Sequence, residues 1–440
     1  MLRRATALAL LTTLVSGAAW AGTTAGRSGP DRGTNILVVG TDSRAGLSKA
    51  EKERLHVGGK GCNCTDVMML VHLSQDGRRA SVVSIPRDSY VEYADGSGVK
   101  GKINGAYARG GGPLTVKTVE KATGLHVHHY LETGFAGFER AVDGLGGATV
   151  CTDTHLADEN SGLDLIPGFH HTDGRGALRY VRARHVGRPG DLGRVRRQQR
   201  AVSDLLTRLT AEGALADPLA TATTVRTLLK SVRTDAGTGL TDLVRIGLTL
   251  GRLSPERTEF ATVAMREFDH RVPGVGSTLL WHEERARALW AALAADRPVS
   301  GDPRIQPVAR NPVPANPAGI AVRVDDAGVA TALRAGGFAV TDTSAAAPAG
   351  RPAGPPLIRY APGREADAAT LAAALPGARR QVVAGHGRSL DVTVGTRPVR
   401  VEEVTYDRNI TDGAPVTGRR LGCLGEQGRY VRAALAGQLG

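Results

Sequence analysis

The chain has 440 residues, which is long enough for two domains with separate hydrophobic cores. Its formal net charge of +13 at pH 7 indicates an anionic partner, such as nucleic acid, anionic lipid or a phosphorylated polymer. Aromatic residues make up only 4% of the chain, which argues against a base-stacking surface for single-stranded nucleic acid.

The N-terminus has the pattern of an export signal. Residues 1–4 form a short basic segment, residues 5–20 are uncharged and mostly apolar, and Ala19-Trp20-Ala21 fits a small-x-small cleavage site. We expect residues 1–22 to be a cleaved signal peptide or a retained membrane anchor. The remainder would then lie outside the cytoplasmic membrane, anchored or secreted in the cell envelope, which argues against a nucleic-acid partner.

The four cysteines are Cys62, Cys64, Cys151 and Cys423. An even count in an exported chain favours disulfides, and no second Cys/His pair at zinc-ligand spacing accompanies Cys62 and Cys64. Three pairings are open. We expect the neighbours Cys62 and Cys64 to reach separate partners, so that Cys151 and Cys423 are both tied to the loop 61–66. The C-terminal tail would then be attached to the first domain.

The first domain is predicted over residues 34–297, where strands alternate with helices and indicate an α/β sandwich. Residues 35–40 have the pattern of a buried strand. Residues 67–73 and 80–85 are apolar runs on either side of the turn Gln75-Asp-Gly-Arg, which predicts a hairpin. Further on, the pattern predicts helices at 114–122, 135–145, 195–209 and 281–293, and strands at 148–152 and 258–265.

A second, smaller α/β domain is predicted over residues 319–398. Six prolines between Pro298 and Pro317 indicate a semi-rigid linker at residues 298–318. After it, strands are expected at 320–324, 338–341, 357–360 and, as a pair, at 381–384 and 390–394, with helices at 327–335 and 365–374. Residues 399–440 are expected to form an irregular tail.

The densest basic segment runs from Arg182 to Arg200, with seven arginines and one acid. Arg182 and Arg184 are two apart, so on a strand they would share a face. Arg194 and Gln198 are four apart and would share a face of a helix. Arginine presents a planar fork that matches phosphate oxygens in pairs, so this spacing predicts a diphosphate site. A solvated basic face is the alternative.

Carboxylates and further cations occur next to three predicted strands and in a nearby motif. Asp42 follows the first strand, Asp66 precedes the second, Arg87 follows the third, and Lys102 lies in Lys-Ile-Asn-Gly-Ala-Tyr. Mg²⁺ prefers one or two carboxylates together with phosphate oxygens and water. Asp42 and Asp66 are therefore candidate ligands of Mg²⁺ or Mn²⁺. The pyrophosphate charge would be neutralised by Arg87, Lys102, Arg182, Arg184 and Arg194.

Taken together, these segments resemble the LytR–CpsA–Psr family of extracytoplasmic cell-wall enzymes. The resemblance is dense over residues 34–199 and weaker to about 297, and residues 319–396 are similar to the small LytR C-terminal domain. Six ordered motifs carry it: Asn35-Ile-Leu-Val-Val-Gly-Thr-Asp-Ser-Arg44, Thr65-Asp-Val-Met-Met-Leu-Val-His72, Val83-Ser-Ile-Pro-Arg-Asp88, Lys102-Ile-Asn-Gly-Ala-Tyr107, Val142-Asp-Gly-Leu-Gly-Gly147, and Ala177-Leu-Arg-Tyr-Val-Arg-Ala-Arg184 with the Gly190…Gln199 segment.

The resemblance implies a mostly antiparallel or mixed sheet between helices, with a polyprenyl-pyrophosphate lipid in an apolar groove. It further implies an enzyme at the membrane surface that transfers a phospho-glycopolymer, such as teichoic acid, from this carrier to peptidoglycan, with pyrophosphatase as a side activity. Asp66 corresponds to the magnesium-linked aspartate, Asp42 to the neighbouring acid and Arg87 to the catalytic arginine. The implied pyrophosphate-binding residues are Lys102, Arg182, Arg184, Arg194 and Gln198.

The chain departs from the family pattern at one position. Many members carry Arg-Ser-Asp where this chain has Cys64-Thr65-Asp66, so a disulfide could fix this loop instead of a charge. This departure supports an alternative function, a non-catalytic envelope protein that binds polyprenyl phosphate or another polyanion. Transcriptional attenuation through DNA is a third hypothesis, and the export signal argues against it.

Overall fold

A computed structural model describes residues 32–423, except 43, 45–46, 58–60, 153, 185, 187–190, 212–216, 307–308, 344–352, 398 and 410–412. The expected signal or anchor segment lies outside the described residues. Among the residues that are described, no helix has the length and apolar character needed to cross a bilayer. The chain divides into two compact units, Met1–Gly301 with Pro415–Gly440, and Asp302–Ala414.

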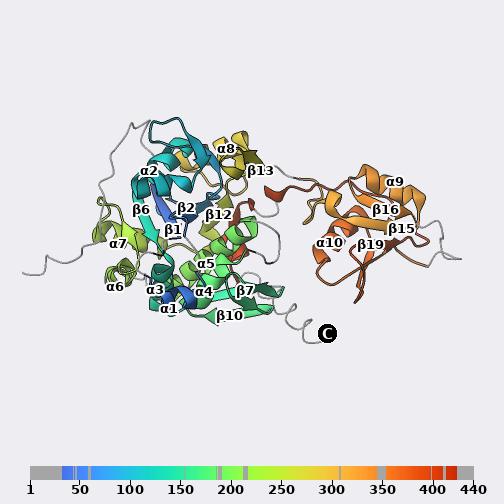
Figure 1. The fold of residues 1–440 in the computed structure, drawn as a ribbon, viewed down its shortest axis with the longest axis horizontal. Coiled ribbons are helices and arrows are strands. Elements are labelled where there is room, and N and C mark those ends of the chain that lie inside the picture. The colour runs from blue at the N-terminus through green and yellow to red at the C-terminus, as the bar shows by residue number, and fades with distance from the viewer. Residues whose placement is uncertain are drawn as a thin grey trace, which may run out of the picture. The chain divides into compact units, whose positions relative to one another are not determined.

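The first unit is organised around a seven-stranded sheet with the order β11-β6-β1-β2-β3-β12-β20 (Figure 1). Neighbours β1 and β2, β2 and β3, β6 and β11, and β12 and β20 are antiparallel, whereas β1 and β6, and β3 and β12, are parallel. The predicted hairpin is thus confirmed, and the sheet is mixed, as the resemblance implied. Its strands are β1 (Thr34–Thr41), β2 (Thr65–Leu73), β3 (Ala80–Ser84), β6 (His129–Thr133), β11 (Arg233–Thr234), β12 (Thr258–Thr262) and β20 (Val416–Thr417).

Helices cover both faces of this sheet, which explains why its inner strands are hydrophobic on both sides. Ile36 and Leu37 are adjacent in β1 and therefore point to opposite faces of the sheet, yet they are only 2% and 0% exposed. Helices α2 and α8 lie on one side of the sheet, and α3, α4 and α5 lie on the other (Figure 1). The helices of this unit are α1 (Lys49–Arg54), α2 (Gly105–Thr123), α3 (Phe135–Gly144), α4 (Gly174–Arg182), α5 (Asp191–Ala211), α6 (Pro218–Leu229), α7 (Leu240–Leu250), α8 (Glu283–Ala294) and α11 (Gly418–Leu421).

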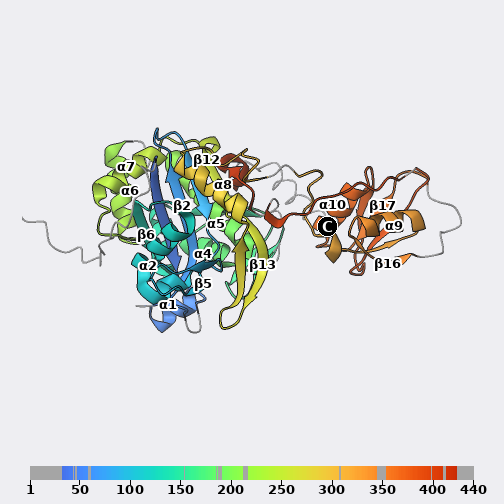
Figure 2. The ribbon, with the colours of Figure 1, turned by 90° about the horizontal axis from the view of Figure 1, so that it is seen from above.

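In the described ranges of the first unit, four two-stranded ribbons accompany the main sheet. The expected strand 258–265 is in fact two, because β12 ends at Thr262 and a new strand starts at Met265. The resulting hairpin extends beyond the sheet (Figure 2), and Trp281 ends it, so the helix predicted from 281 begins at Glu283. The ribbons are β4 (Tyr90–Glu92) with β5 (Lys100–Lys102), β7 (Ala148–Thr152) with β10 (Gly168–Thr172), β8 (Leu156–Asp158) with β9 (Leu163–Leu165), and β13 (Met265–Val272) with β14 (Gly276–Trp281).

The disulfide pairing differs from the expected one. Cys62 bonds Cys64, and Cys151 bonds Cys423. Adjacent cysteines can pair here because Asn63 between them takes a left-handed backbone conformation, with φ 48°, which brings the two Cα atoms to 5.1 Å. The expected attachment of the C-terminal segment to the first unit is nevertheless confirmed, through Cys151 and through β20 at the sheet edge.

The second unit contains a five-stranded sheet with the order β16-β15-β19-β17-β18. Strands β18 and β19 were expected to pair, which is wrong, because β17 lies between them. Helix α10 connects β17 to β18 as a crossover that makes these two strands parallel, and β19 then enters between β15 and β17. The elements are β15 (Ala321–Val324), α9 (Ala327–Ala335), β16 (Ala339–Thr343), β17 (Leu357–Tyr360), α10 (Glu365–Ala374), β18 (Arg379–Val382) and β19 (Leu390–Thr393).

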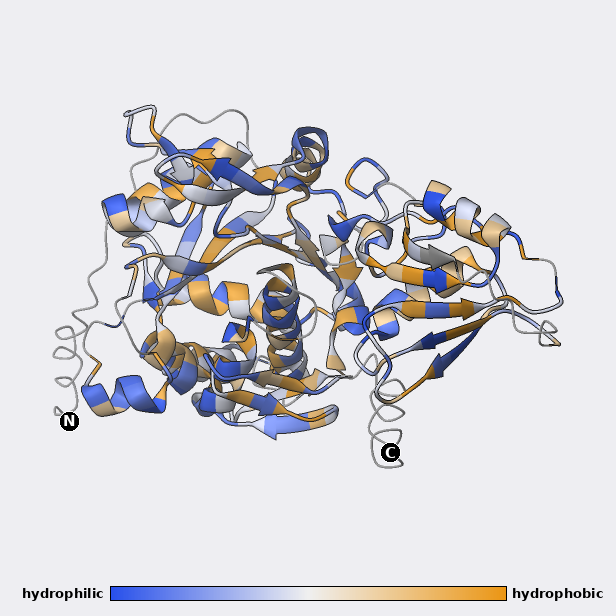
Figure 3. Cartoon of the chain, turned by 45° about the vertical axis from the view of Figure 1, so that its right-hand side comes forward, coloured by the Kyte–Doolittle hydropathy of each residue, from blue (hydrophilic) through white to orange (hydrophobic). Residues whose placement is uncertain are grey.

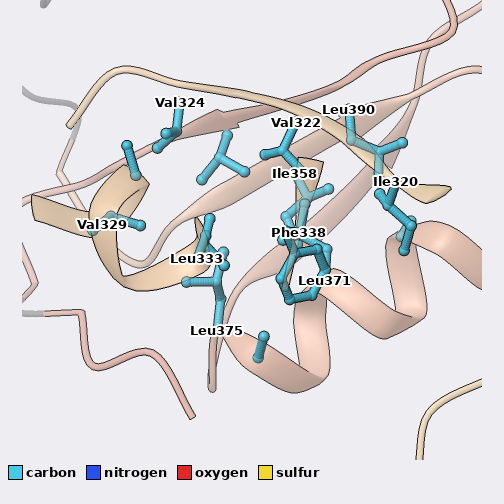
Figure 4. Packing of buried hydrophobic residues seen from close by; sticks show 14 of the residues in the cluster. Ile320, Val322, Val324, Val329, Leu333, Phe338, Ile358, Leu371, Leu375 and Leu390 are labelled. Carbon is cyan, nitrogen blue, oxygen red and sulfur yellow. The ribbon is translucent and has the colours of Figure 1, made fainter. Parts of the chain in front are cut away.

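Hydrophobic residues gather on the inner strands and inner helix faces of each unit (Figure 3). In the second unit, Val322, Leu333 and Leu371 are fully buried and belong to one cluster between the sheet and its helices (Figure 4). The segment predicted as a linker also packs against this cluster through Ala315, and Pro312 forms a bridge to Thr405.

Candidate active site

A cavity of about 530 Å³ lies between the sheet and helix α5, at the end of β1. Its interior is lined by apolar side chains from β1, β2, α3, α4 and α5, while charged side chains surround one end. The apolar residues include Val38, Met69, Phe138, Leu178, Val181, Ala201, Val202 and Leu205. Of the expected site residues, the cavity brings together Asp42, Asp66, Arg87, Arg182, Arg184, Arg194 and Gln198.

Asp66 reaches the cavity because of an irregularity in the strand pairing. Gly40 is opposite Val67, but the next residue, Thr41, is opposite Thr65, so Asp66 is the extra residue of a β-bulge. A bulge releases its extra residue from the ladder and redirects the side chain. The Asp66 carboxylate accepts a hydrogen bond from Nη1 of Arg87, which follows β3. The acid and the arginine predicted from separate motifs therefore form a pair.

Asp42 follows β1 directly and is only 8% exposed. Its backbone N–H donates to the carbonyl of Cys64 over 3.0 Å, which extends the β1–β2 ladder by one residue. The carboxylate accepts from Nε of Arg44 at 3.2 Å and from the backbone N–H of Cys62 at 3.3 Å. The Arg44 guanidinium and the Cys62 amide therefore hold the Asp42 carboxylate at the cavity that Asp66 also lines.

Lys102 does not line the cavity, in contrast to Arg87. Its Nζ lies 2.8 Å from Oδ1 of Asp88, and Oδ2 of the same carboxylate lies 3.5 Å from Nε of Arg87. Lys102, Asp88, Arg87 and Asp66 thus form a chain of alternating charges that leads to the cavity. In this arrangement Lys102 contacts the side chain that orients Arg87.

Arg182 and Arg184 are not on a strand, so the strand spacing used to group them is wrong. Helix α4 ends at Arg182, and Ala183 has left the helical conformation. The guanidinium of Arg182 lies 4.7 Å from the centre of the Phe135 ring and donates to the carbonyls of Leu55 and His56 at 2.9 and 3.1 Å. Burial lowers the pKa of Arg182, and the charges of Asp66 and Asp42 oppose this shift.

Arg184 follows the end of α4 and contacts Asp158, a residue of the site that was not predicted from the sequence. The backbone N–H of Arg184 donates to Oδ2 of Asp158 over 2.6 Å, and Oδ1 of this aspartate accepts from the N–H of Asn160 at 3.0 Å. Both Asp158 and Asn160 line the cavity. They lie at the β8–β9 turn, and no spacing in the sequence connects that turn with the arginines.

Helix α5 places Arg194 and Gln198 on one face, as predicted from their spacing of four residues. The same stripe continues with Ala201, Val202 and Leu205, which are apolar and line the interior. A different face of the helix is fixed to the sheet by Gln199, whose Nε2 donates to the carbonyl of Ala261 at 2.8 Å and to Oγ of Ser84 at 3.0 Å. One helix therefore supplies both the polar end and the apolar wall.

The charged end of the cavity has a net positive lining. Among the described lining residues there are five arginines and three aspartates, namely Arg44, Arg87, Arg182, Arg184 and Arg194, and Asp42, Asp66 and Asp158. A cavity with excess positive charge at its mouth and apolar walls favours a ligand that is anionic at one end and apolar at the other. Among the described residues, no group of three or more His, Cys, Asp or Glu side chains forms a complete metal site.

The fold and the cavity thus define a mixed-sheet α/β protein with a site for an amphipathic anion. Residues 21–294 match the LytR_cpsA_psr family, and residues 326–397 match the family described as LytR cell envelope-related transcriptional attenuator. Because the first match covers more than half of the chain, the chain belongs to the LytR_cpsA_psr family, and the predicted resemblance is confirmed.

Individual relatives agree with this assignment. The chain is 38% identical over 263 residues to the probable cell wall biosynthesis protein LcpB of Corynebacterium glutamicum, covering 59% of this chain and 61% of LcpB. It is 34% identical over 172 residues to the polyisoprenyl-teichoic acid–peptidoglycan teichoic acid transferase TagU of Bacillus cereus, covering 39% of this chain and 51% of TagU. The match therefore spans about half to three fifths of these relatives.

Solved structures confirm the fold of the first unit. The crystal structure of Bacillus subtilis TagV superposes with a TM-score of 0.50 at 22% identity, covering 61% of this chain and 98% of TagV. Protein gbs0355 of Streptococcus agalactiae gives the same TM-score at 20% identity, covering 61% of this chain and 90% of that protein.

Proposed function

We propose that this protein transfers a phosphate-linked glycopolymer from a polyprenyl-pyrophosphate carrier to a hydroxyl group of peptidoglycan, at the outer surface of the membrane. The observation that carries the proposal is the cavity, which joins an apolar wall to a mouth with five arginines. A polyprenyl chain fits the wall and its pyrophosphate fits the mouth. The relationship to TagU, whose name describes a polyisoprenyl-linked donor and a peptidoglycan acceptor, supports it.

In the proposed reaction, the acceptor oxygen attacks the phosphorus on the polymer side of the pyrophosphate. A new P–O bond forms, the P–O–P bond breaks, and polyprenyl phosphate leaves with the negative charge. The acceptor proton passes to a carboxylate, either Asp42 or Asp66, because both line the cavity beside the arginines. The arginines, Arg87 foremost, stabilise the charge that develops on the transferring phosphoryl group.

The donor set fits a divalent cation such as Mg²⁺ or Mn²⁺. Asp66 and Asp42 supply hard carboxylate oxygens at the same end of the cavity, and a Mg²⁺ site commonly needs only one or two of these together with phosphate and water. When bound, the cation would neutralise pyrophosphate oxygens. Because the protein alone offers an incomplete ligand set, we expect cation and pyrophosphate to bind together.

The test uses geranyl pyrophosphate, with water in place of the acceptor hydroxyl, and measures release of phosphate and geranyl phosphate in Mg²⁺. Arg87→Ala and Asp66→Ala should each lower turnover by about 100-fold or more, because each removes a charge at the reacting phosphate. Arg109→Ala is the matched control, since Arg109 is exposed, pairs with Asp95 and does not line the cavity.

Equal turnover in the wild type and in the Arg87 and Asp66 variants would overturn the proposal. Tight binding of geranyl pyrophosphate by the wild type without any product would instead favour the alternative, a non-catalytic polyprenyl-phosphate-binding protein.

A further inference from the structure

The loop that contains Cys62 and Cys64 holds Asp42 by backbone contacts from both cysteines. The N–H of Asp42 donates to the carbonyl of Cys64 at 3.0 Å, and the N–H of Cys62 donates to Oδ2 of Asp42 at 3.3 Å. The two cysteines are joined to each other by a disulfide. One small covalent ring therefore fixes the main chain and the carboxylate of the same aspartate.

The packing around this aspartate is close. Sγ of Cys62 lies 3.8 Å from Oδ2 of Asp42, and because a disulfide sulfur carries no hydrogen, this is a van der Waals contact. A Cβ atom on Gly61 would lie 3.0 Å from the carbonyl oxygen of Asp42, so a larger residue at 61 would displace one of the two segments. Asn63 completes the ring in a left-handed conformation. The position of the Asp42 carboxylate therefore depends on the conformation of the ring.

The two cysteines differ in their exposure to solvent. Cys64 is 6% exposed, whereas Cys62 is exposed and lines the cavity. The second disulfide offers a matched comparison, because Cys151 and Cys423 are both fully buried. A dithiol in solution can therefore attack the disulfide beside the cavity before it reaches the other one.

We propose that the Cys62–Cys64 disulfide is a redox-sensitive positioning element for Asp42. The inference rests on the proposed function, in which Asp42 helps to hold a divalent cation with the pyrophosphate. On reduction, a dithiol supplies two electrons and two protons, the S–S bond becomes two thiols, and the dithiol closes to its own disulfide. The opened loop samples more conformations, so the Asp42 carboxylate loses its fixed position and the site binds the cation less tightly.

The experiment compares three forms of the full-length chain: the oxidised wild type, the wild type reduced briefly with dithiothreitol, and Cys62→Ser/Cys64→Ser. Alkylation and mass spectrometry confirm that only Cys62 and Cys64 have been reduced. The Mg²⁺ concentration that gives half-maximal turnover of geranyl pyrophosphate should rise about 10-fold in the last two forms. Mn²⁺ binding in the presence of geranyl phosphate, measured by electron paramagnetic resonance, should weaken by the same factor without any turnover.

A local readout accompanies these assays. The Asp42 amide, which donates to Cys64, should exchange with deuterium faster after reduction, while amides of the central strand β2 keep their rates. The control Cys151→Ser/Cys423→Ser should lower the thermal unfolding midpoint but leave the Mg²⁺ requirement unchanged. Selective reduction of folded wild type keeps the test independent of whether the serine variant folds.

Two outcomes would overturn the inference alone, and a third would overturn the function on which it rests. An unchanged Mg²⁺ requirement in both the reduced protein and the serine variant, with an active wild type, would overturn it while leaving the proposed function in place. An equal shift in the Cys151/Cys423 control would show general destabilisation rather than positioning. A wild type with neither turnover nor cation-dependent binding would overturn the proposed function itself.

Discussion

The two units of this protein bury different kinds of side chain. In the described part of the second unit, Thr370 is the one buried polar residue among aliphatic and aromatic side chains. The first unit buries several charged and amide groups, including Asp42, Glu132, Glu139, Arg194, Arg197, Gln198 and Gln199. Burying a charge is costly unless the charge is paired and hydrogen-bonded. Such groups stabilise a fold poorly, and three of them, Asp42, Arg194 and Gln198, line the cavity. This difference supports our proposal that the chemistry takes place in the first unit.

The largest effect is expected when one of the charged side chains that line the cavity is removed. Arg194→Ala should lower geranyl pyrophosphate turnover by about 100- to 1000-fold, equivalent to about 3–4 kcal/mol, because it removes a cation that lines the cavity mouth. Arg196→Ala, two residues away on α5, is the matched control, since Arg196 does not line the cavity and its Nη1 contacts Gln199. The two variants should differ in kinetics and agree in helix content by circular dichroism.

A similar loss of turnover in both variants would mean that α5 contributes net charge or stability rather than a specific phosphate contact. The distinction between the two units would then rest on burial alone.

Much of the first unit could be predicted from the sequence, because its signals are local. The β2–β3 hairpin follows from apolar runs around a polar turn, and the pairing of Arg194 with Gln198 follows from helical spacing. Asp158 could not be found in this way. Its place beside Arg184 depends on how the β8–β9 ribbon packs against the end of α4, which is a tertiary contact between residues 26 positions apart.

The wrong predictions have the same origin. Arg182 and Arg184 were grouped by strand periodicity, but a helix end followed by an extended residue also brings two arginines to the same cavity. The disulfide pairing failed because Asn63 takes a left-handed conformation that local sequence does not specify. The bulge at Asp66 was not predicted at all, because it depends on a register shift between two strands, and composition carries no information about register.

The second prediction tests the apolar core of the second unit. Leu371→Ala should lower the free energy of unfolding of that unit by about 3 kcal/mol, because Leu371 is fully buried in its core and the truncation leaves a cavity. Turnover at 25 °C should not change. Differential scanning calorimetry would measure the stability, with Leu37→Ala in β1, equally buried, as the counterpart that lowers the stability of the first unit.

Loss of turnover in Leu371→Ala, at a temperature where the first unit remains folded, would contradict the prediction that the second unit takes no part in the reaction. The second unit would then take part in the reaction despite its apolar core.

The third prediction concerns a buried acid of the first unit. Burial raises the pKa of Asp204 to about 7, against the opposing effects of the Cys423 N–H and Arg200. Between the unfolded pKa near 4 and the folded pKa, the folded state retains a proton that the unfolded state has lost. Stability of the first unit should therefore fall as the pH rises, by roughly 2 kcal/mol from pH 5 to pH 7.

Asp204→Asn should remove this slope, because the amide does not ionise and its oxygen can still accept from the Cys423 N–H. Urea unfolding at pH 5, 6 and 7 would measure how the free energy of unfolding depends on pH. The exposed Glu53→Gln variant should keep the wild-type slope. An unchanged slope in Asp204→Asn would assign the pH dependence to other groups.

The smallest effect on turnover is expected for Lys102, which does not line the cavity and acts on it only through Asp88 and Arg87. Lys102→Met removes the cation that holds Asp88, and Asp88 in turn contacts Nε of Arg87. Because Arg87 keeps its pair with Asp66, we expect turnover to fall by only about 10-fold, with the KM for geranyl pyrophosphate nearly unchanged. Lys100→Met is the control, since Lys100 is exposed on the same strand. A large rise in KM for Lys102→Met alone would show instead that Lys102 binds pyrophosphate directly, as the family resemblance implied.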